Sequence, residues 1–190
     1  MISWICDKIL KLWGWKVEGE YPRHIKKNIV IAAPHTSNWD FPVGVMHRAA
    51  TKINVTWVGK ASLFKGPLGF FTRFMNGIPV DRTKNNNFVD AVVEAYNQRE
   101  EMSILIAPEG TRKYVDKLKT GFYYIALGAK IPIVMIQSDW STKTMRWAER
   151  FYPTGDKEKD FEEIYAFFKP AIGKIPEYTL RYKLNKEVSS

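Results

Sequence analysis

The chain has 190 residues, which is enough for one domain with a sizeable core. Its composition is 45% hydrophobic and 26% charged, which excludes a disordered, collagen-like or low-complexity chain. The formal net charge of +9 favours an anionic partner: a nucleic acid, an anionic membrane surface or a phosphorylated small molecule. We therefore expect residues 1–190 to form a single domain with an anionic ligand.

The first 20 residues have the pattern of an amphipathic helix that ends near Gly14. No apolar run in the chain reaches the roughly 20 residues that span a bilayer, and no signal-peptide cleavage pattern follows this segment. Two interpretations are open: the helix packs on the core, or it lies in a membrane interface with its lysines toward anionic headgroups. Five apolar residues lie on one helical face: Ile2, Ile5, Ile9, Leu12 and Trp13.

From residue 28 onward, short apolar runs rich in β-branched residues alternate with helical patterns. The predicted strands are residues 28–34, 53–59, 102–108 and 131–137, and residues 78–82 are predicted to form a further strand and the turn that ends it. The predicted helices are residues 41–51, a short helix within 64–77, then 88–101, 120–130 and 156–170.

This alternation predicts an α/β fold with a mainly parallel mixed sheet flanked by helices, beside the N-terminal amphipathic helix. We expect Gly128 to close the helix over 120–130 and Pro170 to close the helix over 156–170. The final stretch, residues 174–190, is polar and basic, and is expected to be peripheral.

The motif HTSNWD directly follows the first long predicted strand, where ligand sites of open α/β sheets cluster. A histidine held by a carboxylate is the usual form of a general base, so His35 and Asp40 are candidate catalytic residues. Their contact requires a turn, which the proline, serine and asparagine of this stretch favour. The alternative is that Asp40 caps the helix beginning at Phe41 and His35 is a loop residue.

The stretch APEGTR follows the strand over 102–108, and thus ends at the same sheet edge as HTSNWD. A Gly-Thr turn exposes backbone N–H groups, and arginine binds phosphate in a bidentate manner. Taken alone, this stretch could equally be an ordinary polar turn.

Cations follow three of the predicted strands: Lys60, Arg82 and Arg112. Each alone is typical of a solvated charge, but their recurrence predicts a phosphate pocket beside His35. The sequence has no Walker loop, no G-x-G-x-x-G, no H-E-x-x-H and no G-x-S-x-G. Its three histidines lack metal-ligand spacing and its one cysteine, Cys6, cannot build a zinc cage, so we expect no metal and no cofactor.

In order along the chain, HTSNWD, GIPVDR, APEGTR and IPIVMI resemble the four motif blocks of the glycerolipid acyltransferases typified by 1-acylglycerol-3-phosphate acyltransferase. The resemblance covers about residues 28–137. Two positions depart from the family pattern, because Ala107 stands where an aromatic residue is usual and Met135 stands where a second proline is common. These departures concern the shape of the pocket more than its chemistry.

The resemblance implies acyl transfer from acyl-CoA or an acyl carrier protein to the hydroxyl of a lysophospholipid. By analogy, His35 is the base and Asp40 orients it. The acceptor-binding residues that it implies are Lys60, Arg82, Glu109, Gly110, Thr111 and Arg112. It also implies an anionic membrane surface as partner and a cytoplasmic, peripheral location on the inner face of the membrane, with residues 1–20 as the interfacial segment.

Lysophosphatidic acid is the acceptor that the family favours, and another anionic lyso-lipid would fit the same motifs. Two other functions stay open at this point. A membrane-surface lipid-binding protein could keep the fold without catalysis, and a nucleic-acid-binding protein would suit the charge but lacks any recognised reading motif.

Overall fold

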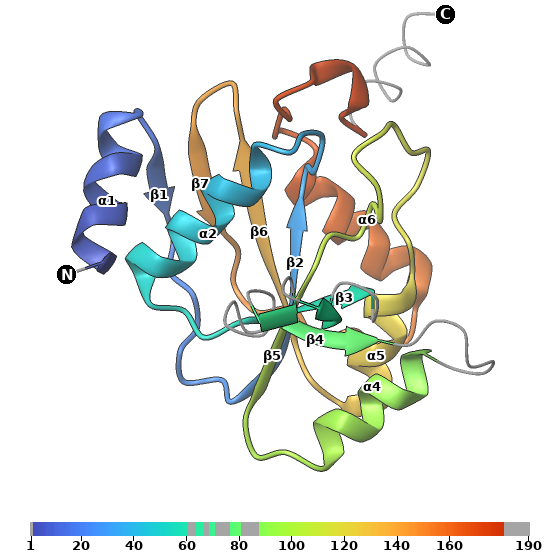
Figure 1. Ribbon diagram of the computed structural model, residues 1–190. Helices are drawn as coiled ribbons and strands as arrows, with labels where there is room; N and C mark the ends of the chain where they lie inside the picture. The colour runs from blue at the N-terminus through green and yellow to red at the C-terminus, as the bar shows by residue number, and fades with distance from the viewer. Residues whose placement is uncertain (1, 61–63, 67–68, 71–76, 81–87, 181–190) are drawn as a thin grey trace, which may run out of the picture.

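The computed structural model of the protein describes residues 2–60, 64–66, 69–70, 77–80 and 88–180. A seven-stranded sheet in the order β1-β7-β6-β2-β5-β3-β4 forms its centre, with helices on both faces (Figure 1). The strands are β1 (Lys16–Glu18), β2 (Lys27–Ala33), β3 (Thr56–Lys60), β4 (Gly77–Val80), β5 (Met102–Ile106), β6 (Ile133–Asp139) and β7 (Thr144–Trp147). The sheet is flanked by helices α1 (Ile2–Leu12), α2 (Asp40–Thr51), α4 (Phe88–Asn97), α5 (Gly121–Ala129) and α6 (Lys157–Phe168), and a 3-10 helix, η2 (Pro176–Tyr178), follows them.

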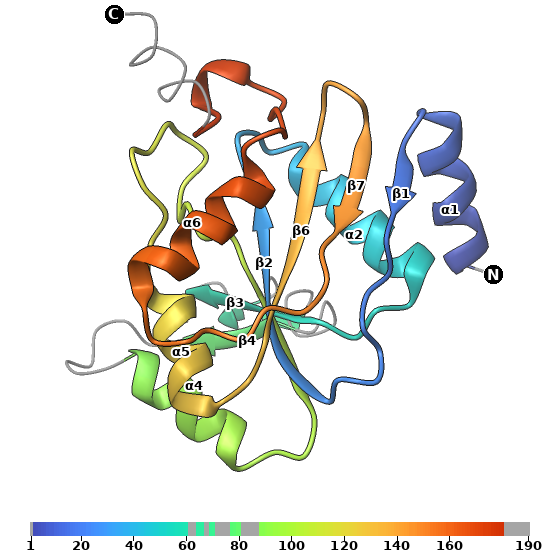
Figure 2. The same ribbon diagram turned by 180° about the vertical axis from the view of Figure 1, so that it is seen from behind.

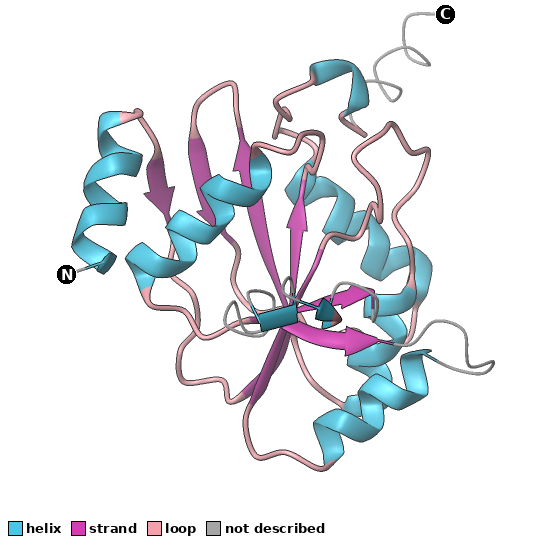
Figure 3. Cartoon of the chain, in the orientation of Figure 1, coloured by secondary structure: helices cyan, strands magenta, loops and turns pink. Residues whose placement is uncertain are grey.

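The sheet is mixed and mainly parallel, as predicted. Strands β6, β2, β5, β3 and β4 all run in one direction, whereas β7 is antiparallel to β6 and β1 is parallel to β7. The carboxyl ends of the five parallel strands therefore meet at one edge of the sheet. Figure 3 shows the loops that leave this edge for the helices. Ligand sites of such sheets form at this edge.

Strand β2 explains why the sheet is covered on both faces. Its side chains alternate, so Ile29 and Ile31 join the core beneath α4, α5 and α6, while Val30 joins the core beneath α1 and α2. All three are fully buried. Figure 2 shows α4, α5 and α6 from behind, on the face opposite α2. A strand buried on both faces has a continuous apolar run, which is the pattern by which the sequence revealed it.

The sequence predicted five strands, and the structure adds β1 and β7. Strand β1 has three residues, all of them exposed, and β7 has four residues, one of them exposed. Neither forms an apolar run long enough to give a periodic signal. Strand β7 turns back from β6 as a hairpin and in turn supports β1 at the edge of the sheet.

Several predicted boundaries were wrong for reasons of packing. Helix α5 continues through Gly128 to Ala129. A Cβ atom at Gly128 would lie 2.9 Å from Val93 of α4, so this glycine allows the two helices to approach closely. Strand β3 begins at Thr56 and not at Ile53. Ile53 is a buried residue of the preceding loop, so its apolar side chain does not mark the start of the strand. Most of the short helix predicted within 64–77 lies outside the described residues.

The stretch 174–180, expected to be peripheral, packs on the body of the protein. Thr179 is buried, and the backbone N–H of Ile175 donates to Thr36 Oγ1 at 3.1 Å. Residues 181–190 lie outside the described part of the chain.

Helix α1 presents its apolar stripe to solvent. It contacts α2 through Ser3, whose hydroxyl donates to the carbonyl of Ala50 at 2.8 Å, and through the buried Leu10. The helix ends as predicted, with Gly14 at a φ of 89°. No helix in the described residues has the length and apolar character to cross a membrane. Four apolar residues of the stripe are 42–89% exposed: Ile2, Ile5, Ile9 and Leu12.

Candidate active site

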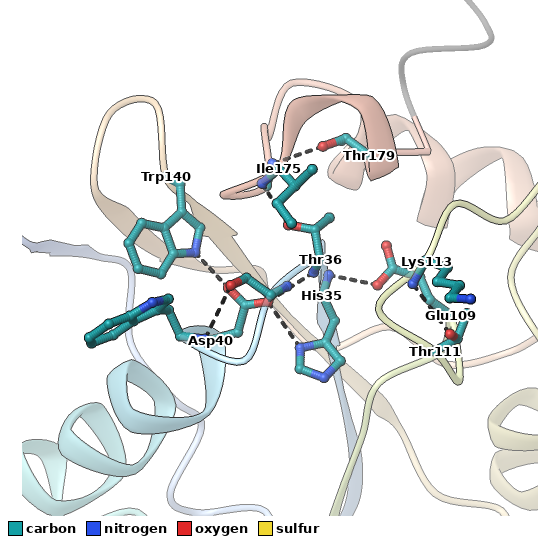
Figure 4. Close-up of polar contacts among 12 residues, drawn as sticks. His35, Thr36, Asp40, Glu109, Thr111, Lys113, Trp140, Ile175 and Thr179 are labelled. Carbon is teal, nitrogen blue, oxygen red and sulfur yellow. Dashed lines mark hydrogen bonds and ion pairs between the residues drawn. The ribbon is translucent and has the colours of Figure 1, made fainter.

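The loop between β2 and α2 is organised around the carboxylate of Asp40 at the carboxyl edge of the sheet (Figure 4). Its Oδ2 atom accepts the backbone N–H groups of Thr36 and Ser37, each at 2.8 Å. The same atom lies 3.1 Å from Nδ1 of His35. These bonds form the turn that the His–Asp contact requires, so the predicted pairing of the two side chains is confirmed by the geometry.

Asp40 is not the N-cap of α2. Helix α2 begins at Asp40 itself, Trp39 occupies the capping position, and no side-chain capping bond is made there. The Asp40 side chain instead turns back along the chain, toward residues that precede the helix. The alternative that Asp40 serves only to cap the helix is therefore wrong.

The hydrogen bonds assign the tautomer of His35. An ionised carboxylate only accepts hydrogen bonds, so Nδ1 of His35 carries the hydrogen and donates it to Asp40. Nε2 is then left as an acceptor. The His35 side chain is 26% exposed, against 7% for Asp40. The site therefore buries the carboxylate and leaves the imidazole accessible, which suits an imidazole that takes a proton from an external group.

Glu109 follows β5 and supports His35 from the other side. Strands β2 and β5 pair in parallel, so their ends bring Glu109 Oε2 to 2.6 Å from the backbone N–H of His35. Glu109 is 2% exposed, and burial raises its pKa to about 7, against a smaller lowering effect of the His35 N–H bond. A cavity of about 20 Å³ lies beside it, lined mainly by apolar side chains such as Leu118 and Phe168. In this geometry, Glu109 supports the His35 backbone and is not presented to solvent.

The other predicted site residues lie at the same edge or outside the described chain. Gly110, Thr111 and Arg112 are exposed in the loop that begins after Glu109. Gly110 has a φ of 67°, and a Cβ there would meet the end of the Lys119 side chain at 2.7 Å. Lys60 ends β3, and its side chain lies outside the described part, as does all of Arg82.

Two features of the site carried no signal in the sequence. Trp140, in the turn between β6 and β7, donates its indole N–H to Asp40 Oδ1 at 2.6 Å. The segment after α6 crosses the loop, where Gly173 packs so closely on Thr36 that a Cβ would lie 2.5 Å from its side chain. Both contacts join residues about a hundred positions or more apart, which local patterns do not reveal.

A family model described as Acyltransferase matches residues 14–138, about two thirds of the chain. The chain belongs to the Acyltransferase family. This matched range contains His35, Asp40 and Glu109, although Trp140 lies just beyond it.

Two relatives of this family member illustrate the range of similarity. A human protein named 1-acyl-sn-glycerol-3-phosphate acyltransferase beta is 24% identical over an alignment of 162 residues. The match covers 82% of this chain and 58% of that protein. The chain thus spans little more than half the length of that relative. The crystal structure of the 1-acyl-sn-glycerophosphate (LPA) acyltransferase PlsC from Thermotoga maritima matches with a TM-score of 0.55 at 19% identity. The match covers 100% of this chain and 79% of that one, and it supports the α/β fold.

Proposed function

We propose that this chain transfers an acyl group from an acyl thioester to the hydroxyl of a lysophospholipid, with 1-acylglycerol-3-phosphate as the favoured acceptor. The observation that carries the proposal is the His35–Asp40 pair, in a chain of the Acyltransferase family. Asp40 holds Nδ1 of His35 at 3.1 Å, and the imidazole is 26% exposed at the edge of the sheet. The human relative named for this reaction supports the choice of acceptor.

The proposed reaction proceeds by direct attack. The acceptor oxygen bonds to the thioester carbonyl carbon while its proton passes to Nε2 of His35. The carbon–sulfur bond then breaks, and the same proton passes from Nε2 to the departing sulfur. The products are an ester and a free thiol. An alcohol is a poor nucleophile without a base, and such general-base assistance is worth about 10² to 10⁴ in rate.

Arg112 is the residue we propose for the acceptor phosphate. It is exposed in the loop that follows Glu109, at the edge where His35 lies. A guanidinium binds a phosphate through two parallel hydrogen bonds, which an ammonium group cannot do. We propose that Gly110 and Thr111 of the same turn, with Lys60 and Arg82 from the neighbouring strands, complete the binding of the acceptor headgroup.

We further propose that the exposed apolar stripe of α1 rests in an anionic membrane surface. Lys8 and Lys11 lie on one side of the stripe, where Lys11 also pairs with Asp7 at 2.8 Å. The chain carries a net charge of +9, which suits anionic headgroups. The apolar surface extends to the site, because Trp13 contacts Trp39 edge to face with ring centroids 6.0 Å apart. Trp39 and Phe41, which flank Asp40, are 53% and 51% exposed. A lipid acceptor could then reach His35 from the bilayer.

The reaction is tested by supplying donors and acceptors in combination. Acyl-CoA and acyl carrier protein thioesters are each incubated with lysophosphatidic acid, with a lyso-lipid bearing another anionic headgroup, and with no acceptor. Lipid products are then identified by mass spectrometry. We expect a diacyl product that depends on the acceptor and declines about tenfold with Arg112→Ala, through a higher KM for the acceptor. Lys113→Ala removes the neighbouring charge and is the matched control. No acyl product with any pair would reject the reaction.

The membrane surface is tested by vesicle sedimentation with Ile5→Glu and Leu12→Glu combined. Both side chains lie on the exposed stripe, so the fold should persist while binding to anionic vesicles falls at least about tenfold. Tyr152→Glu is the control, because Tyr152 is also exposed, at 56%. Its neighbour Phe151 pairs with Ile133 at the amino end of β6, at the edge of the sheet opposite the one where the carboxyl ends meet. Unchanged binding by the folded double variant would contradict the proposed surface.

A further inference from the structure

The two oxygens of the Asp40 carboxylate accept hydrogen bonds from different groups of donors. Three donors converge on Oδ2: the backbone N–H groups of Thr36 and Ser37, and Nδ1 of His35. The other oxygen, Oδ1, accepts the indole N–H of Trp140 at 2.6 Å. Donors on one oxygen hold that atom in place but leave the carboxylate plane free to tilt about it. A donor on the second oxygen sets the plane, and with it the direction in which Oδ2 meets His35.

Trp140 is held in place independently of this bond. Its backbone N–H donates to the carbonyl of Ile172 at 2.8 Å. Its ring contacts Trp13 and Trp15 edge to face, with centroids 6.0 and 5.0 Å apart, and Lys174 Nζ lies 4.3 Å from the ring centroid on its face. The indole is therefore a rigid donor aimed at Asp40. Tryptophan has one polar hydrogen and no acceptor, so in this contact Asp40 Oδ1 is the acceptor.

We propose that Trp140 is a positioning residue of the active site, which acts through Asp40 to hold His35 in its base-competent orientation. This inference rests on the proposed acyl transfer. It adds a residue from the β6–β7 turn to a His–Asp pair whose other hydrogen bonds come from the loops after β2 and β5. Trp140 donates its one side-chain hydrogen bond to Asp40, so its effect is expected on the rate of the chemical step and not on substrate binding.

The chain offers a matched pair of substitutions. Trp140→Phe keeps an aromatic ring among the tryptophans and removes the one N–H that Asp40 receives. Trp15→Phe makes the same change in the same cluster, at a residue that is 4% exposed. Among the described residues, Trp15 Nε1 has no hydrogen-bond partner, so this variant loses packing but no hydrogen bond. Any effect of altered aromatic packing appears in both variants, whereas loss of positioning appears only in Trp140→Phe.

The kinetic experiment compares kcat and KM for the two variants and the wild type. We expect Trp140→Phe to lower kcat roughly tenfold to a hundredfold, the scale of a small misplacement of a catalytic group, with KM for the acyl thioester unchanged. Trp15→Phe should retain the wild-type kcat. Equal kcat values for the two variants, or a Trp140→Phe effect confined to KM, would overturn the proposal.

A second readout needs no turnover. The ring nitrogens of His35, labelled with ¹⁵N and assigned by comparison with His35→Ala, report the tautomer and the bond to Asp40. We expect their signals to change in Trp140→Phe and to remain unchanged in Trp15→Phe. Should the wild type transfer no acyl group, the proposed function fails but this measurement still decides the role of Trp140. Unchanged His35 signals in Trp140→Phe would then reject it.

Discussion

Strand β2 carries a buried polar network at each end, and the two networks differ in what they leave open. At its amino end, the Asn28 side chain bonds Tyr21 at 2.9 Å and accepts from Ser103 at 2.7 Å. Tyr21 in turn donates to Ser103, and Tyr96 donates to the Asn28 carbonyl. Asn28 and Tyr96 are fully buried. Each of these four side chains therefore has a hydrogen-bond partner within the network.

The network at the carboxyl end of β2 differs because one of its side chains, His35, is partly exposed. Asp40 is surrounded by donors, and Glu109 accepts the His35 backbone N–H, yet the imidazole of His35 is 26% exposed. Satisfied buried groups stabilise a fold, whereas one unsatisfied and exposed acceptor held in a fixed direction can do chemistry. On this comparison, the amino end of the strand stabilises the fold, and the carboxyl end is where we propose that catalysis takes place.

The largest expected effect is on catalysis, from Asp40→Asn. The amide cannot accept from Thr36, Ser37 and His35 on one side and from Trp140 on the other, because one of its two ends is a donor. We expect kcat to fall about 10²- to 10⁴-fold while the circular dichroism spectrum is retained. Asp156→Asn is the control, since Asp156 caps α6 and asparagine caps equally well. A kcat near that of the wild type would remove Asp40 from the mechanism.

The next effect is on stability, and it concerns the buried carboxyl group of Glu109 at the carboxyl end of β2. Burial raises the pKa of Glu109 to about 7, so the folded protein binds its proton more tightly than the unfolded chain does. Protonated Glu109 therefore adds stability that is complete below about pH 4.5 and is lost as the pH rises through about 7. Glu109→Gln can still accept from His35 but does not titrate.

We expect the free energy of unfolding of the wild type, relative to Glu109→Gln, to fall by at most about 3 kcal/mol between pH 5 and pH 8. Urea unfolding of both proteins across this range measures the difference, in which the other titrating groups cancel. A difference that rises with pH, or stays flat, would show that Glu109 is not buried as a poorly solvated carboxyl group.

The smallest expected effect tests the amino end. Asn28→Ala leaves Ser103 and Tyr21 with fewer buried partners, so we expect the free energy of unfolding to fall by about 1–3 kcal/mol. The kcat of the folded variant should stay at the wild-type value, because among the described residues no bond of this network reaches the other end of β2. A loss of kcat without a loss of stability would contradict a purely stabilising role for the amino end of β2.

The parts of this architecture that follow from local pattern were predictable from the sequence. The buried strand β2 is a continuous apolar run, and His35 and Asp40 are five residues apart directly after it. Parallel pairing then brings Glu109 to the same edge, as the order of strands and helices implied.

The contacts that were missed depend on distant residues or on backbone groups. A lone tryptophan in a hairpin turn gives no signal that Trp140 will donate to Asp40. The stretch 174–180 is polar and basic, which is typical of an exposed tail. This stretch instead contacts the site loop through the backbone N–H of Ile175, which donates to Thr36. Just before it, Gly173 has no side chain, so the backbone can approach Thr36 closely. Composition reveals neither contact. Strands β1 and β7 are too short to form a periodic pattern.

The most direct test of the central claim is the release of free thiol from acyl-CoA, with and without lysophosphatidic acid, by the wild type and by His35→Ala side by side. His35 is a partly exposed loop residue, so the variant should remain folded, which a cooperative urea unfolding curve checks. We predict acceptor-dependent thiol release by the wild type and a loss of about 10²- to 10⁴-fold in the variant. Undiminished acceptor-dependent release by a folded His35→Ala protein would contradict the assignment of catalysis to this end of β2.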